Sequence, residues 1–114
     1  YVFGGYGRHD EELGDMWMLR CDSAATGTAS WELVAPTSEH TPIARAAATL
    51  SPVSLSDSAH PVGLILFGGH DEDETYINDV WLFDTRTAPW TMLRPHTAQQ
   101  VAGSSVRPDG RFGH

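Results

Sequence analysis

Two short acidic segments are the first candidates for a functional site. They are residues 8–12, with the sequence RHDEE, and residues 70–74, with the sequence HDEDE. Clustered carboxylates in a loop can attract a basic protein partner and speed its association. The alternative interpretation is a solvated loop that serves only solubility. The carboxylates predicted to contact a partner are Asp10, Glu11, Glu12, Asp71, Glu72, Asp73 and Glu74.

The same residue types could also bind a metal ion. Asp71, Asp73 and Glu74 carry the oxygen ligands that Ca²⁺ prefers, but the alternating ligands, central glycine and distal glutamate of an EF-hand are absent. A histidine precedes an aspartate in each segment, at His9 and His70, which could suggest a transition metal. Neither segment has a second clustered histidine. We therefore expect surface histidines and neither a metal nor another cofactor.

The charge balance narrows the classes of partner. The formal net charge is −8, from 15 acids and 7 bases, and every base is an arginine. A nucleic-acid ligand or an anionic membrane would require a basic surface, so neither is expected. Cys21 is the only cysteine, and Asn78 is not in a glycosylation motif. These two facts favour an intracellular, cytoplasmic setting.

An internal repeat explains how the acidic segments are positioned. Phe3-Gly4-Gly5 recurs as Phe67-Gly68-Gly69, and the run at 14–19 recurs at 78–83, both at an offset of 64. Trp31 recurs as Trp90 at an offset of 59. The order is kept while the offsets change by a few residues, which is typical of a structural repeat with loops of variable length.

The repeated segments predict β-strands and no helix longer than one or two turns. Short apolar runs end at glycine or proline, and no segment has an amphipathic helical period. The expected strands are residues 2–3, 15–20, 31–34, 46–50, 64–67, 80–83 and 90–93. Strands that are apolar on both faces must be covered on both faces, which favours antiparallel four-stranded sheets packed against one another.

These residues resemble the kelch repeat, a β-propeller unit. The resemblance is carried by LILFGG, NDVWLFD, WTML and PDGRFGH, and it covers nearly the whole chain. It implies an all-β fold of four-stranded antiparallel blades and a fragment of a longer propeller. Residues 1–41 would supply strands two to four of one blade and a linking loop, 42–95 a complete blade, and 96–114 a loop and the start of the next. The first copy departs from the pattern where Gly14 replaces the asparagine and where 44–48 lacks Gly-His.

The repeated positions are interpreted as structural. We expect tryptophans at these spacings in the core, and Arg45 and Arg111 as hydrogen-bonding residues that tie neighbouring loops together. The alternative for the arginines is an anion clamp near the central channel. The residues assigned to the repeat are Gly4, Gly5, Trp17, Trp31, Arg45, Gly68, Gly69, Trp81, Trp90 and Arg111.

The sequence therefore predicts a non-enzymatic scaffold whose acidic loops bind another protein. Loops between strands two and three should share one propeller face with the loops that lead into strand one, at 37–41 and 96–107. The alternative is a propeller enzyme of the galactose-oxidase type, whose relatives use tyrosine, histidine and a Tyr–Cys crosslink. The chain has no nucleophile elbow, zinc motif or phosphate loop, and catalytic residues would have to lie mostly in the remaining blades.

Overall fold

A computed structural model describes residues 1–55 and 62–97. These residues form seven β-strands, and no helix occurs among them. The strands are β1 (Val2–Tyr6), β2 (Glu12–Ser23), β3 (Thr28–Leu33), β4 (Thr49–Val53), β5 (Gly63–Phe67), β6 (Val80–Asp84) and β7 (Trp90–Arg94). The predicted all-β class is confirmed, and in the described part of the chain no helix is long or apolar enough to cross a membrane.

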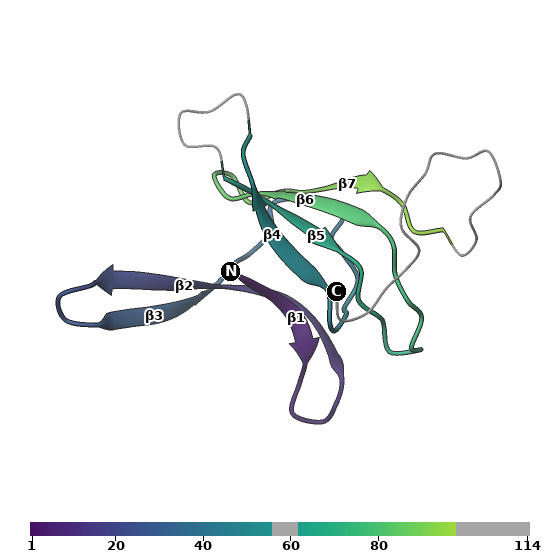
Figure 1. The fold of residues 1–114 in the computed structure, drawn as a ribbon, viewed down its shortest axis with the longest axis horizontal. Helices are drawn as coiled ribbons and strands as arrows, with labels where there is room; N and C mark the ends of the chain where they lie inside the picture. Colours follow the sequence, from purple (N-terminus) through teal and green to yellow (C-terminus); the bar gives the residue numbers. More distant parts are fainter. Residues whose placement is uncertain (56–61, 98–114) are drawn as a thin grey trace.

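The strands form two antiparallel sheets in simple up-and-down order. One sheet has the order β1-β2-β3 and the other β4-β5-β6-β7, as Figure 1 shows. The two sheets share a register. Val2 pairs with Trp17 in the first sheet, and Leu66 pairs with Trp81 in the second, each 64 residues further along the chain. The repeat seen in the sequence is therefore a repeat of strand pairing as well as of residue type.

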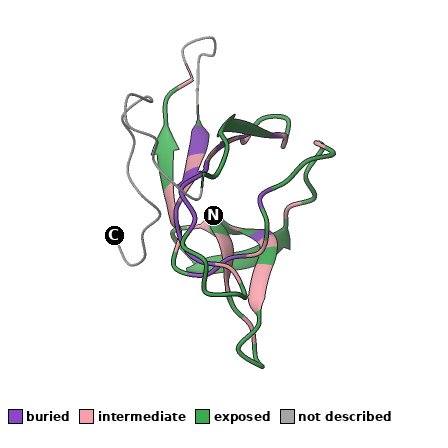
Figure 2. Cartoon of the chain, turned by 90° about the vertical axis from the view of Figure 1, so that its right-hand side faces the viewer, coloured by how far each residue is buried: buried purple, intermediate pink, exposed green. Residues whose placement is uncertain are grey.

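The core lies between the two sheets. Leu66, Trp81 and Phe83 are at most 4% exposed and face Met16 of the first sheet, which is 3% exposed. The ring of Phe3 packs edge-on against Trp90, with 5.3 Å between ring centroids. Figure 2 shows the buried residues concentrated on β5 and β6. Because alternate residues of a strand share a face, one face of each sheet supplies this core.

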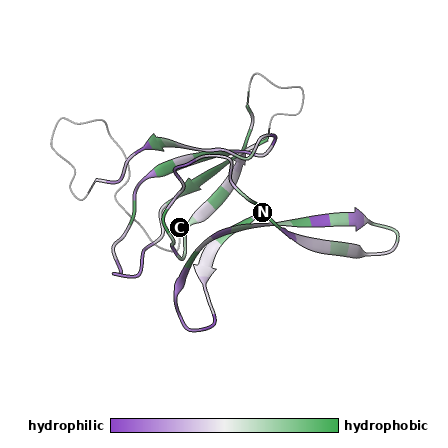
Figure 3. Cartoon of the chain, turned by 180° about the vertical axis from the view of Figure 1, so that it is seen from behind, coloured by the Kyte–Doolittle hydropathy of each residue, from purple (hydrophilic) through white to green (hydrophobic). Residues whose placement is uncertain are grey.

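Two of the four tryptophans are buried in the described sheets and two are exposed there, so a core position stays a prediction for the exposed pair. Trp17 is 37% exposed and Trp31 is 57% exposed, whereas Trp81 and Trp90 are 4% and 5% exposed. Trp17 and Trp31 lie on the face of the first sheet that points away from the second, and Figure 3 shows both hydrophobic and hydrophilic residues along this β2–β3 hairpin. Among the described residues, no further sheet packs on that face. Equivalent positions of the repeat differ in burial because only one of them has a neighbouring sheet.

The strand that leads into the second sheet begins later than predicted. Residues 46–50 were expected as a strand, but β4 covers Thr49–Val53. Ala46 forms an isolated bridge with His70, and Ala47 has a φ of 55°, so the backbone turns before β4 begins. Pro52 lies within β4, and it is tolerated there because β4 is an edge strand of the described sheet.

The two glycine pairs also differ in their relation to the strands. Gly68 and Gly69 follow β5 as predicted, whereas Gly4 and Gly5 lie inside β1 at a register shift. All four have a positive φ between 64° and 98°, which explains why glycine recurs there.

Candidate functional site

The two acidic segments form loops with the same backbone geometry. In the β1–β2 loop, Gly7 N donates to Glu11 O at 2.7 Å and Asp10 N donates to Gly7 O at 3.4 Å. In the β5–β6 loop, Asp71 N donates to Thr75 O at 3.3 Å and Glu74 N donates to Asp71 O at 2.9 Å. Each hydrogen bond of the first loop therefore recurs in the second loop between residues 64 positions further along the chain. Both loops lie on the same side of the molecule, at the lower edge of Figure 1.

The carboxylates in these loops have different structural roles. Asp71 Oδ1 accepts hydrogen bonds from the backbone amides of Asp73 and Thr75, both at 3.0 Å, so this side chain shapes its own loop. Glu11 does the same in the first loop, because its Oε2 accepts a bond of 2.8 Å from His9 N. Asp10 and Glu74 occupy matching left-handed positions, with φ of 62° and 58°.

The carboxylates that face solvent are Asp10, Glu11, Glu72, Asp73 and Glu74.

Glu12 and His70 do not lie where the sequence placed them. Glu12 was assigned to the exposed loop, but it is the first residue of β2 and its side chain is 10% exposed. His70 was expected on the surface and is 6% exposed. Its Nδ1 lies 3.6 Å from Glu12 Oε1, and its Nε2 is hydrogen-bonded to the Tyr6 hydroxyl at 3.1 Å. The packing of the two sheets buries both residues, because Tyr6 and Glu12 belong to the first sheet and His70 lies three residues after the end of β5 in the second.

A cavity of about 290 Å³ opens beside this cluster. Its lining residues are Tyr6, His70, Glu74 and Tyr76. A second cavity is lined by Glu12, Ile43, Ala44, Asp71, Glu72 and Asp73. Each predicted acidic residue except Asp10 and Glu11 therefore lines one of two cavities between the repeats.

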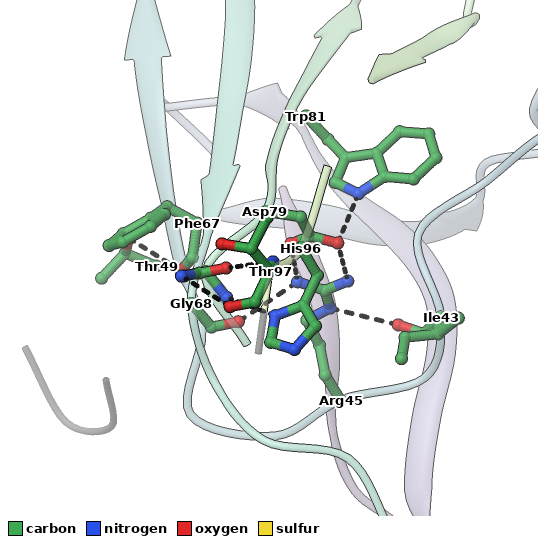
Figure 4. Close-up of polar contacts among 10 residues, drawn as sticks. Ile43, Arg45, Thr49, Phe67, Gly68, Asp79, Trp81, His96 and Thr97 are labelled. Atoms are coloured by element: carbon green, nitrogen blue, oxygen red, sulfur yellow. Dashed lines mark hydrogen bonds and ion pairs between the residues drawn. The ribbon is translucent and has the colours of Figure 1, made fainter. Parts of the chain in front are cut away.

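Arg45 joins the two sheets beneath the loops. Its Nη1 and Nη2 bond Asp79 Oδ1 and Oδ2 at 2.5 and 2.8 Å, and it also donates to the carbonyls of Gly68 and Ile43 (Figure 4). The Asp79 carboxylate in turn accepts a bond of 2.8 Å from Trp81 Nε1. The Arg45 carbonyl accepts a bond from Gly5 N across the sheets. With 0% exposure, Arg45 has no surface with which to bind a dissolved anion.

Arg111, its predicted counterpart, lies outside the described residues.

The perturbed ionisable groups lie away from the acidic loops. A side-chain hydrogen bond from Arg86 lowers the pKa of Asp84, the last residue of β6, to about 2. A hydrogen bond to Glu32 raises the pKa of Arg20 on the β2–β3 hairpin. Both are exposed or partly exposed ion pairs that stabilise their own hairpins.

No group of three or more histidine, cysteine, aspartate or glutamate side chains is arranged to hold a metal ion in residues 1–55 and 62–97. Within the acidic loop, Asp71 Oδ1 accepts two backbone amides and so serves the loop's own conformation. Cys21 is exposed on β2.

Sequence reasoning missed the two tyrosines of the cavity. Tyr6 occupies the position equivalent to His70, and Tyr76 occupies the position equivalent to Glu12, both at an offset of 64. The sequence repeat could have pointed to these tyrosines. Equivalent positions that differ in residue type between the two copies are candidates for a function specific to one copy. The meeting of Tyr6 with His70 could not be anticipated, because it depends on how closely the sheets pack.

Comparisons with known proteins agree with this architecture. The family model of the kelch motif matches residues 64–97. Aligned over 126 positions that include the whole chain, the sequence is 32% identical to Kelch domain-containing protein 3 of Rattus norvegicus and of Mus musculus, and 29% identical to that of Bos taurus. The chain spans 27% of the length of these relatives. The chain therefore belongs to the kelch-repeat family, and its described strands form two sheets of a kelch β-propeller.

Proposed function

We propose that this chain is part of a protein-interaction scaffold that binds a basic partner through its two acidic loops. Kelch repeats suit such a role, because rigid sheets hold loops at defined positions. The observation that carries the proposal is the shared geometry of the β1–β2 and β5–β6 loops. Each loop is closed by equivalent backbone hydrogen bonds. Both loops therefore hold their carboxylates in a defined backbone conformation on the same side of the molecule.

The charge of this surface supports a basic partner. The two loops together carry five solvent-facing carboxylates, and Arg8 is their only arginine or lysine. A negative patch raises the encounter rate with a positively charged surface, and salt weakens that attraction. The partner's arginine or lysine side chains would therefore meet the loops before any close packing forms.

The test compares association rates of a partner recovered with the full-length protein. The loop variant replaces Glu72 by Gln and Asp73 by Asn, and it keeps Asp71 because that side chain holds the loop. The control variant replaces Asp22 by Asn and Glu32 by Gln, which removes the same charge from the β2–β3 hairpin.

We expect the loop variant to associate about three- to ten-fold more slowly than wild type at low salt, with little difference at high salt. The control variant should associate at the wild-type rate. Equal rates for all three proteins at both salt concentrations would show that the loop acids serve solubility alone.

A further inference from the structure

The cavity beside the acidic loop has the composition of a site for an organic cation. Two tyrosine rings, a histidine and a glutamate line it, and both tyrosines are more than half exposed at its mouth. Aromatic faces attract cations through their quadrupole, and the attraction grows when a carboxylate lies nearby. Cavity, aromatic surface and negative charge therefore occur together at one point between the two sheets.

The walls of the cavity are held in place before any ligand arrives. His70 exchanges two backbone hydrogen bonds of 3.0 Å with Ala46. These bonds hold the backbone from which the His70 ring projects. The Tyr6 hydroxyl is 3.1 Å from His70 Nε2, and the two ring centroids lie 5.7 Å apart. Glu74 is held in a left-handed conformation within the loop that Asp71 closes. A preorganised site loses less entropy when it binds a ligand.

A second carboxylate adds to the negative potential of this site. Glu12 lies behind His70, with its Oε1 3.6 Å from the ring and its side chain only 10% exposed. A charge close to the protein interior is screened less by salt than a charge in open solvent. Arg8, in the neighbouring loop, is exposed and is the only fixed positive charge in either loop.

We propose that this cavity binds a cationic side chain, arginine or lysine, of a protein partner. The cation would contact the Tyr6 and Tyr76 rings and form an ion pair with Glu74, while Glu12 favours it from behind His70. This inference rests on the proposed function, because it names the contact that a basic partner makes. It assigns specific recognition to Glu74 and general attraction to Glu72 and Asp73.

The test uses three small probes with the full-length protein: N-acetyl-arginine amide, N-acetyl-lysine amide and N-acetyl-citrulline amide. Citrulline has the shape of arginine without its charge. Fluorine NMR of 3-fluorotyrosine at positions 6 and 76 reports binding at the cavity. We expect the arginine or lysine probe to shift these two signals and to bind about ten-fold more tightly than citrulline, as expected for a charge paired with carboxylates.

Three variants locate the binding. Glu74→Gln and Tyr76→Leu should each weaken the cationic probe about three-fold or more, and Tyr76→Phe, which keeps the ring, should bind as wild type. Glu72→Gln is the matched control, because it removes the same charge from the same loop outside this cavity. Citrulline binding as tightly as arginine, or equal losses in Glu72→Gln and Glu74→Gln, would overturn the proposal.

The probe experiment and the partner experiment can reject the cation site and the proposed function independently of each other. If cationic probes bind at the tyrosines but the loop variant associates with the partner at the wild-type rate, the cavity is a cation site and the proposed function is wrong. If the partner needs the loops but citrulline binds as well as arginine, the proposed function stands and the cation site is rejected.

Discussion

At the scale of single residues, Trp81 connects the core with the polar network beneath the loops. Its ring packs edge-on against Trp90, while its Nε1 donates to Asp79. One side chain therefore contributes both to the aromatic packing of the second sheet and to the position of the carboxylate that holds Arg45.

Replacing Trp81 by alanine should lower the free energy of unfolding of the full-length propeller by about 3–5 kcal/mol. The reason is the loss of a large side chain that is 4% exposed. Denaturant unfolding of wild type and variant measures the change. Because Trp31 is 57% exposed in the described sheets, an equal loss for Trp31→Ala would show that another blade covers it in the full protein. An unchanged Trp81→Ala protein would contradict the core role.

The ion pair between Arg45 and Asp79 gives a second residue-level prediction. Asp79→Asn leaves a buried guanidinium without its carboxylate, and we expect a loss of about 3–5 kcal/mol in unfolding free energy. Glu32→Gln is the control, since the Arg20–Glu32 pair is more than half exposed and should contribute less than about 1 kcal/mol. Denaturant unfolding again gives both values. Equal losses for the two variants would mean that burial of Arg45 does not matter.

At the scale of elements, the sequence predicted the strands better than their contacts. Glycine pairs, tryptophans and apolar runs located the strands, because these residues respond to the local backbone and to alternation. The delayed start of β4 followed from the bridge between Ala46 and His70, which joins segments 24 residues apart. The burial of His70 and Glu12 depended on packing between sheets, which no local pattern encodes.

The turn that follows β5 depends on Gly69. It has a φ of +86°, and an added Cβ would clash with the backbone oxygen of Ala46. Gly69→Ala should therefore destabilise the protein by more than Gly27→Ala. Gly27 has a φ of +63° in the β2–β3 turn, with open space around its Cα, so it carries only the left-handed backbone cost of about 1–2 kcal/mol.

Thermal unfolding of the two glycine variants in the full-length protein separates these contributions. Gly69→Ala should also shift the fluorine signal of a labelled Tyr6, because His70 and Tyr6 are hydrogen-bonded. A Gly69→Ala protein as stable as Gly27→Ala would show that the backbone of Ala46 moves aside without cost.

At the scale of the whole molecule, the two sheets leave one apolar face uncovered. Val2, Trp17, Leu19, Trp31 and Leu33 lie on the outer face of the first sheet, and each is at least 37% exposed. The equivalent face of the second sheet is covered by Phe3 and Met16. Blade-on-blade packing in the longer propeller would cover the first face in the same way.

The central claim, that the acidic loops form the binding face, is tested most directly by hydrogen–deuterium exchange of the full-length protein with and without its partner. The account predicts that binding slows exchange at residues 7–12 and 70–76, while the turns at 24–27 and 85–89 exchange as before. The acidic loops and these turns lie at opposite ends of β2 and β6. The exchange of each loop can therefore be compared with that of a turn in the same sheet. Protection at the 24–27 and 85–89 turns, with unchanged exchange in both acidic loops, would contradict the account.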